Sequence, residues 1–581
     1  MPNETTKTRG TIAVVDALGA IVQTELLCAR ALWAPRPPGK HPETSVAHAF
    51  DEKVEWLGDD VDDAEHALAA CEKAASKGLR VAAILSSASL AGARPALRRL
   101  VEERRSVVVH VLVSPKGKPA SATGYADVQA VADLGVGVLV ARDAQDASDF
   151  VIVAHRAAED AETPILVVHD GYPASYAHDR VVLPDAPLVR AALEPAPPAL
   201  VSSSDAVLPA HRRAAGRVPF AVSSAMRAFE RLSGRRLDAI DAHHTGNAEI
   251  ALVCSGAIAE TARAVVEHAR GEEQHVPIGL VQVLTLRPFP GAQIVKALSR
   301  VRAIAVIDRI DVALAQSNPL ATEVKAAFAD ALTWTPGYPG IGRIPHIFSG
   351  SVDPSENEAT PGDIFAIIDN LLQGEHGNRV FHVGGAHPHG GALTTAGDRV
   401  VHAKNAFALR THGAPRLLLH LLGDLYDAHV RATPRPSEDG EAYDLTVSPT
   451  PVRAHHGASA LDVVVLTSKP SEADHDAVER LREGGAAVLI GVTREQLPAA
   501  VRAALAARGA RTLSMPAGAH GDASVIGAVL RLRPRAGLDR NALLADAERS
   551  LRTASPSLSD ADVRGSLEAL GRALDLAVDA G

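Results

Sequence analysis

The chain has 581 residues, which is too long for one hydrophobic core, and typical domain sizes predict three or four domains. Hydrophobic residues make up 46% and charged residues 22%, a balance that is ordinary for globular proteins and excludes disordered and collagen-like classes. Aromatic residues make up only 3% and the net charge is −10. The chain therefore offers few rings for base stacking and repels phosphate backbones, and we expect no nucleic-acid partner.

The N-terminus and the apolar runs predict where the protein works. Residues 1–10 are polar and lack the apolar run of a secretory signal. No later stretch reaches about 18 apolar residues without charges. We expect a cytoplasmic protein without a membrane partner.

The cysteines predict that the chain alone holds no iron–sulfur cluster. Cys28, Cys71 and Cys254 lie far apart and never form a Cys-x-x-Cys pair. An ordinary cluster needs four thiolates, so three scattered cysteines are interpreted as buried or idle thiols.

The first part of the chain, from residue 11 to about 185, alternates short apolar runs with helical patterns. Near-continuous apolar strands separated by helices indicate a parallel sheet covered on both faces. Strands are expected at 81–85, 107–113, 136–140 and 164–168, and helices at 64–76 and 146–160.

A Pro-rich stretch with Ser and Arg follows, including PAPPALVSSSD, and it is typical of a linker or strap. A second α/β unit comes after it. Its strands are expected at 250–254, 278–284 and 303–308, and its helices at 257–269, 291–298 and 360–372.

A third α/β unit begins near residue 379 with the segment HVGGAHPHGG. Strands are expected at 461–467, 487–491 and 511–515, helices at 475–483 and 497–508, and terminal helices in the tail 541–580. The predicted organisation is 1–200, a linker or strap at 201–245, 246–377, 378–535 and C-terminal helices at 536–581.

Ordered motifs occur in all three units. The first has an Asp-Gly pair after its last strand; the second has a Ser-Gly turn, a Glu-Thr helix start, an Arg-Pro-Phe-Pro turn and an Asp-Arg strand end. The third has a strand, a helix and a Gly-Gly turn before its next strand. These residues are Asp170, Gly171, Ser255, Gly256, Glu260, Thr261, 287–290, Asp308, Arg309 and 461–491. In this order they resemble the N-terminal domains I to III of the pyruvate:ferredoxin (flavodoxin) oxidoreductase family.

The resemblance implies an α/β fold of three successive parallel-sheet domains. They are a thiamine-enzyme pyrimidine-binding-like domain, a transketolase C-terminal-like domain and an acceptor-oxidoreductase gamma-like domain. The family continues with a cysteine-rich segment and a domain that holds magnesium and the diphosphate, and we find neither in this sequence. The resemblance therefore implies that this chain alone binds no cofactor. Thiamine diphosphate, magnesium, iron–sulfur clusters and coenzyme A are expected only with a partner subunit.

The resemblance also implies a degenerate active site. In the family a Glu beside the aminopyrimidine relays the proton that generates the thiazolium carbanion. The segment VEWLGDDVDDAE places Asp59 near that position, with Glu55 before it. Asp is one methylene shorter, and a displacement of about 1 Å can slow a reaction about 100-fold. The alternative interpretation is an acidic helix start stabilised by the helix dipole. Asp59 and Glu55 are the catalytic candidates.

Two other family elements differ here. The family's first loop carries a Thr near the substrate, whereas WAPRPPG at 33–39 has none. A family Arg clamps the substrate carboxylate after a His-Val strand. Here Ser114 or Lys116 follows that strand, and lysine lacks the planar fork of arginine.

The His/Gly-rich segment suggests two kinds of site. His382, His387 and His389 are closely spaced, as in some zinc or copper sites, but no Cys or second ligand cluster accompanies them, and we expect no metal. In the family a Gly-rich, Lys-containing run near this point is associated with coenzyme A. Gly384 and Gly385, with Lys404, are similar to that run and are the cofactor-binding candidates.

Three functions remain open. The first is a subunit or scaffold of a 2-oxoacid (pyruvate):ferredoxin oxidoreductase-like redox complex, without turnover alone. The second is a non-catalytic assembly module of another redox enzyme, such as a sulfite reductase. The third is an independent enzyme with an unrelated substrate, because fold does not fix chemistry. We expect redox partner subunits and a homodimer or larger complex, since surfaces built for burial leave apolar patches on a monomer.

Overall fold

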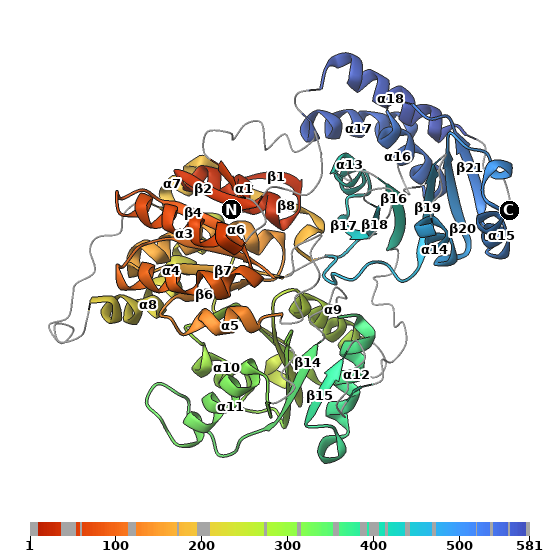
Figure 1. The fold of residues 1–581 in the computed structure, drawn as a ribbon. Coiled ribbons are helices and arrows are strands. Elements are labelled where there is room, and N and C mark those ends of the chain that lie inside the picture. The colour runs from red at the N-terminus through yellow and green to blue at the C-terminus, as the bar shows by residue number, and fades with distance from the viewer. Residues whose placement is uncertain are drawn as a thin grey trace, which may run out of the picture.

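In the computed structural model the chain folds into three α/β units, each built on one β-sheet (Figure 1). The prediction of three successive α/β domains is confirmed, and every sheet also contains antiparallel strands. The structure describes residues 10–35, 54–57, 61–113, 124–170, 174–193, 210–271, 276–310, 315–352, 359–383, 392–393, 406–412, 416–435, 442–467, 472–518, 520–534, 539–555 and 558–576.

The first sheet has seven strands, of which six run parallel. The predicted strands at 81–85, 107–113, 136–140 and 164–168 form its centre, where near-continuous apolar runs are buried on both faces. Across the sheet the strands are β12 (Thr285–Arg287), β6 (Gly137–Ala141), β7 (Ile165–His169), β5 (Val108–Leu112), β4 (Val81–Ser86), β2 (Ala31–Pro35) and β3 (Val54–Leu57).

Helices cover both faces of the first sheet. One face carries α1 (Ala17–Cys28), α6 (Ala144–Ala161), α7 (Ala186–Ala192) and α8 (Ala210–Ser233). The other carries α3 (Val61–Ala75), α4 (Leu90–Glu102) and α5 (Ala126–Ala132).

Helix α8 corrects the expected linker at 201–245. It has 24 residues, packs on α6 and contributes Val222, Met226 and Phe229 to the core. The spacing of these residues follows one face of a helix. The Pro-rich composition concealed this pattern, and Pro219 lies inside the helix. After α8 the same segment enters the second sheet.

The second sheet has six strands, of which five run parallel and the edge strand β9 is antiparallel. Its order is β15 (Val380–Val383), β14 (His346–Val352), β13 (Ala303–Asp308), β10 (Ile250–Ser255), β11 (Ile278–Val283) and β9 (Ile240–His243). Strand β15 corrects the expected boundary at 377/378, because it completes this sheet.

Helices α9 (Ala257–Gly271) and α12 (Pro361–Leu372) cover one face of the second sheet. Helices α10 (Gly291–Leu298) and α11 (Pro319–Leu332) cover the other. The core on that second side continues into the core under α4 and α5, so the first two units share one hydrophobic cluster.

The third sheet has eight strands and is half antiparallel and half parallel. Its order is β1 (Gly10–Val15), β8 (His178–Pro184), β17 (His429–Arg435), β18 (Ala442–Ser448), β16 (Phe407–His412), β19 (Leu461–Thr467), β20 (Leu481–Ile490) and β21 (Arg511–Met515). Strands β1 and β8 correct the expected domains 1–200 and 378–535, because the first part of the chain lends two strands to the third unit. Edge strands present unpaired backbone groups to any neighbour, so sequence patterns do not reveal this pairing.

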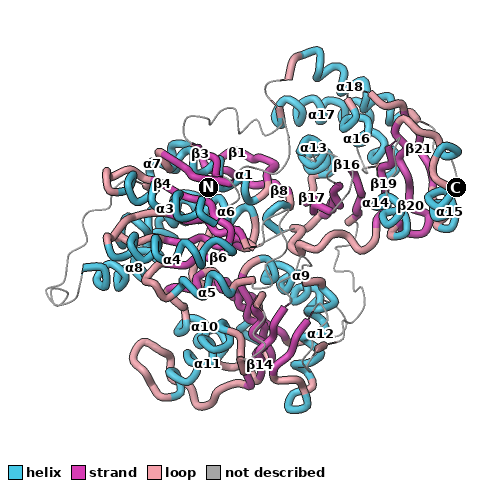
Figure 2. The backbone as a smooth tube through the Cα atoms, viewed as in Figure 1, coloured by secondary structure: helices cyan, strands magenta, loops and turns pink. Residues whose placement is uncertain are grey.

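Helices also cover both faces of the third sheet (Figure 2). Helices α14 (Glu472–Glu479) and α15 (Ala499–Ala507) lie on one face. Helices α13 (Arg416–Tyr426), α16 (Gly521–Leu532), α17 (Arg540–Ala554) and α18 (Asp560–Leu574) lie on the other. The last two are the predicted terminal helices. Among the described helices, none combines the length and apolarity needed to cross a membrane.

Candidate functional site

The structure brings none of the predicted site residues into one described cluster. Glu55 lies on β3, where it pairs in register with Trp33 of β2. Asp59 lies outside the described residues, as do Gly384 and Gly385.

Lys404, Ser114 and Lys116 also fall outside the described residues, together with His387 and His389. The remaining histidine of the His/Gly-rich segment, His382, is on β15 and is buried.

Among the described residues, the carboxyl edge of the first sheet contains two buried polar atoms without hydrogen-bond partners, on Ser87 and His169. Strands β4, β5 and β7 run parallel, so their carboxyl ends meet at one edge, where open α/β sheets bind ligands. Among the described residues, no hydrogen-bond partner reaches Oγ of Ser87, which follows β4, or Nδ1 of His169, the last residue of β7. Buried polar atoms are normally satisfied, so this edge offers groups for water or a ligand.

Asp170, directly after β7, joins the first unit to the second. Its Oδ2 accepts the backbone N–H of Ala257 at the start of α9 (N to Oδ2, 2.5 Å). Its Oδ1 lies 3.4 Å from Nη1 of Arg309, which follows β13. The Asp170 and Arg309 side chains are only 3% and 4% exposed, so this ion pair is almost fully screened from water.

Gly256 makes this contact sterically possible. Its φ is +71°, and a Cβ atom there would collide with the Asp170 carboxylate and the Tyr125 hydroxyl. Tyr125 belongs to the first unit, and its backbone N–H donates to the Arg309 carbonyl (3.1 Å). We call Tyr125, Asp170, Gly256 and Arg309 the first junction. Three of its four residues belong to motifs noted in the sequence.

Burial dominates the titration of groups at the first junction. It raises the pKa of Tyr125 far above its ordinary value, and the charge of Asp170 adds to this effect. Burial also raises the pKa of Asp308, beside Arg309, to about 6. Asp308, next to the first junction, is therefore partly protonated near pH 6.

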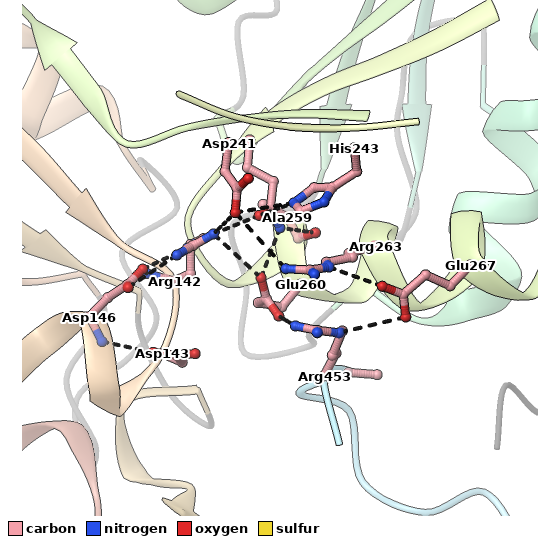
Figure 3. Close-up of polar contacts among 12 residues, drawn as sticks. Arg142, Asp143, Asp146, Asp241, His243, Ala259, Glu260, Arg263, Glu267 and Arg453 are labelled. Atoms are coloured by element: carbon pink, nitrogen blue, oxygen red, sulfur yellow. Dashed lines mark hydrogen bonds and ion pairs between the residues drawn. The ribbon is translucent and has the colours of Figure 1, made fainter. Parts of the chain in front are cut away.

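A second polar cluster, which we call the Arg142 network, joins all three units (Figure 3). It consists of Arg142, Asp146, Asp241, Glu260, Gln282 and Arg453. Arg142 lies between β6 and α6. Its guanidinium contacts Asp146 (Nε to Oδ2, 2.6 Å), Asp241 on β9 (Nη1 to Oδ2, 2.9 Å) and Gln282 on β11 (Nη1 to Oε1, 2.7 Å).

Glu260 extends the network to the third unit. Its Oε1 accepts from Nε2 of Gln282 (2.9 Å), and its Oε2 accepts from Nη1 of Arg453 (2.9 Å), which lies between β18 and β19. Burial alone would raise the pKa of Glu260, but the charges of Arg142 and Arg453 outweigh it and lower the pKa to about 2. Glu260 is therefore ionised at neutral pH and serves as an attachment point rather than an acid or base.

Sequence reasoning missed Arg142, Asp241 and Arg453, because the contacts that join them to other units span 99 to 193 residues of the chain. The available signal was positional. Arg142 directly follows an apolar strand, at the edge where polar residues of α/β proteins gather. Glu260 was noted only as part of a Glu-Thr helix start.

The described residues show no metal centre. No group of three or more His, Cys, Asp or Glu among them could hold a metal ion. Cys28, Cys71 and Cys254 are buried and form no disulfide among the described residues, and burial is the main cause of the raised pKa values of the Cys28 and Cys254 thiols. The paired charges of the first junction and of the Arg142 network connect the α/β units to one another.

Comparison with known proteins gives two family matches. Residues 41–226 match a domain described as pyruvate flavodoxin/ferredoxin oxidoreductase, thiamine diP-bdg. Residues 248–342 match one described as pyruvate:ferredoxin oxidoreductase core domain II. The two matched segments contribute opposite sides of the first junction.

Individual relatives are distant. A pyruvate-flavodoxin oxidoreductase of Trichormus variabilis is 26% identical over 306 residues, 48% of this chain and 24% of the relative. Pyruvate synthase subunit PorA of Methanothermobacter thermautotrophicus is 26% identical over 314 residues, 50% of this chain and 81% of PorA. A structure of 2-oxoglutarate:ferredoxin oxidoreductase from Magnetococcus marinus is similar over 63% of this chain and 65% of its own, with 13% identity and a TM-score of 0.40.

The chain spans about a quarter of the length of the pyruvate-flavodoxin oxidoreductases that it matches. Within that span, both family domains occur in order along the chain. Taken with these relatives, they show that this part of the chain is similar to pyruvate:ferredoxin oxidoreductases.

Proposed function

We propose that this chain is a subunit of a 2-oxoacid (pyruvate):ferredoxin oxidoreductase-like redox complex and turns over substrate only with partner subunits. Its match to PorA extends over 81% of that protein, whose name describes it as a subunit of pyruvate synthase. We propose that this chain is likewise one subunit of a larger complex.

The first junction is the observation that carries the proposal. Asp170 lies in the segment that matches the thiamine-binding domain, while Gly256 and Arg309 lie in the segment that matches core domain II. These motif residues meet in a buried contact that only glycine at position 256 permits. This contact supports a role that needs the two family domains in a fixed relative position.

The proposal assigns thiamine diphosphate binding to the assembled complex rather than to this chain alone. Among the described residues, the carboxyl edge of the first sheet offers the Ser87 hydroxyl and Nδ1 of His169 as polar atoms without a hydrogen-bond partner. A diphosphate needs magnesium or other cations to balance its charge. The described residues contain no cluster that could hold a metal. We therefore propose that thiamine diphosphate, magnesium, iron–sulfur clusters and coenzyme A act in the assembled complex and not on this chain alone.

The sequence around the expected catalytic position supports dependence on partners. Asp59 stands near the place of the family's proton-relaying Glu, and residues 33–39 lack the family's Thr. Both changes remove groups that act on the substrate or cofactor in the family.

The test compares the isolated chain with the complex purified from its native host through a tag on this chain. We expect the isolated chain to be colourless and to show no pyruvate- or 2-oxoglutarate-dependent reduction of a viologen dye with coenzyme A. The complex is expected to be brown and active. A variant Arg309→Lys should recover less complex than Arg98→Lys, because Arg309 is buried at the first junction whereas the Arg98 side chain is 69% exposed.

Turnover by the isolated chain would contradict the proposal. A stable monomer in light scattering that brings no redox subunit with it would also contradict it. A sulfite reductase in the purified complex would instead establish the assembly-module alternative.

A further inference from the structure

A buried series of titratable side chains runs from α1 to the last residue of β7. Oε1 of Glu25 lies 2.7 Å from Nε2 of His110 on β5, and Nδ1 of His110 lies 3.2 Å from Nε2 of His169. Nε2 of His155 on α6 lies 2.8 Å from the other carboxylate oxygen of Glu25, Oε2. Glu25 and His110 are 0% exposed and His169 is 2% exposed, so the series is closed to bulk water.

The charge of Glu25 fixes the direction of its hydrogen bonds. Burial would raise the pKa of Glu25, but the charge of His155 and the hydrogen bonds from His110 and His155 outweigh burial and lower the pKa to about 2. An ionised carboxylate only accepts hydrogen bonds. Nε2 of His110 and Nε2 of His155 therefore both carry hydrogens.

Two proton arrangements fit the contact between His110 and His169. When His110 is neutral, its Nδ1 accepts from Nε2–H of His169, and Nδ1 of His169 keeps a lone pair. When His110 is cationic, its Nδ1–H donates to Nε2 of His169, and Nδ1 of His169 carries a hydrogen. The two arrangements differ by one proton that enters at Nδ1 of His169, while the Nε2 proton of His169 moves to Nδ1 of His110.

We propose that Glu25, His110 and His169 form a proton relay whose accepting atom is Nδ1 of His169, at the carboxyl edge of the first sheet. That atom has no hydrogen-bond partner among the described residues. The ligand class it fits is a group with an acidic N–H or O–H hydrogen. The transferred proton ends on His110, where the cation lies against the Glu25 carboxylate.

The relay explains how His169 can accept a proton although its own cationic form is unfavourable. Burial, and then the charge of His110, lower the pKa of His169 well below its ordinary value, so His169 does not retain a positive charge. Transfer to His110 moves the charge next to a fixed anion. His169 is thus the contact atom, and Glu25 is a positioning residue that acts through His110.

Other charged and titratable groups around the relay are paired or neutral. On α1, burial keeps the Cys28 thiol protonated at neutral pH by raising its pKa. Arg80, near Cys28, is held by Glu159 of α6 (Nε to Oε1, 2.6 Å). His155 is the only other described ring that contacts Glu25. It offers a matched control because it is buried like His110 but is not part of the series.

The relay is a property of the protein itself, whereas its use on a bound cofactor or 2-oxoacid rests on the proposed function. The test therefore contains no substrate, so its failure is distinguishable from a failure of the proposed function. The full chain is labelled with ¹⁵N-histidine, and tautomers are read from two-bond ¹H–¹⁵N spectra. Signals are assigned by their loss in His169→Gln and His110→Gln.

We expect His169 to be the Nε2–H tautomer at neutral pH. As the pH falls, His169 should change to Nδ1–H in the same interval in which His110 becomes cationic. In Glu25→Gln this interval should move at least about one pH unit lower, a tenfold loss of proton affinity, because the anion that stabilises cationic His110 is absent. In His155→Gln the two rings should still change together.

Independent titration of His110 and His169 in the wild-type chain would overturn the relay, and this measurement remains decisive if Glu25→Gln does not fold. A His169 tautomer that stays constant while His110 titrates would also overturn it, since it would mean that a resident water only fills the position at Nδ1. An unchanged interval in a folded Glu25→Gln variant would remove Glu25 from the relay.

Discussion

The first junction and the Arg142 network both join units of this protein, but they use different physics. The first junction is small and buried and depends on shape, because Gly256 alone lets Asp170 reach the backbone of α9. The Arg142 network is larger, reaches the third unit through Arg453, and depends on charges that are partly exposed. The comparison indicates that the first junction holds the two family domains together by shape, whereas the charged contacts between the Arg142 network and the third unit, which also contains strands β1 and β8, can be weakened by salt and pH.

The most severe test of this comparison is Gly256→Ala. The added Cβ would meet the Asp170 carboxylate and the Tyr125 hydroxyl, and the backbone at φ +71° disfavours any other residue. We expect a loss of about 4 kcal/mol in the free energy of unfolding, measured by urea denaturation. Gly234→Ala is the control, because Gly234 has φ +75° and no atom lies within 4 Å of its Cβ position. It should cost only about 1 kcal/mol. Equal costs would show that shape does not govern the first junction.

Removal of the central charge of the Arg142 network should cause the second-largest loss of stability. Arg142→Met leaves Asp146 and Asp241 without their shared cation, and breaking such a part-buried set is expected to cost about 3 kcal/mol in thermal unfolding. Arg98→Met removes the same charge from an exposed pair on α4 and should cost less than about 0.5 kcal/mol. A similar melting temperature for both variants would contradict the role given to Arg142.

The stability contributions of Asp308, next to the first junction, and of Glu260, in the Arg142 network, should change with pH in opposite directions. The folded pKa of Asp308 is raised to about 6 from an ordinary 3.8, so its contribution to stability is complete below about pH 4 and is lost as the pH rises through 6. The folded pKa of Glu260 is lowered to about 2 from 4.5, so its contribution is present above about pH 4.5 and is lost as the pH falls towards 2.

Each contribution should amount to about 3 kcal/mol, and substitution should remove it from the pH profile of stability. Asp308→Asn should flatten the profile between pH 4 and 6, and Glu260→Gln should flatten it below pH 4.5. Profiles that keep the wild-type slope in these windows would mean that other groups titrate there.

The smallest expected effect is that of Arg453→Met, about 1 kcal/mol, because the Arg453 side chain is 21% exposed. This loss should shrink further in 1 M salt, which screens partly exposed charges. Limited proteolysis should then separate the third unit from the other two more readily than in the wild type. A salt-independent loss would indicate that packing, not charge, determines the contribution of Arg453.

The sequence by itself determined the class of structure and the centres of the sheets. Four consecutive apolar runs in the first unit became β4, β5, β6 and β7, because period and apolarity are local properties. The motif residues Asp170, Gly256 and Arg309 were also visible in the sequence, although nothing local showed that they meet.

Tertiary structure alone decided where units end and which charges pair. Strands β1 and β8 come from the first part of the chain but belong to the third sheet, and β12 comes from the second unit but belongs to the first sheet. Arg142 contacts Asp241 and Gln282, which are 99 and 140 residues away in the chain. Strand edges and single charged side chains carry no periodic signal, because their partners are selected by the packing of units that are already folded.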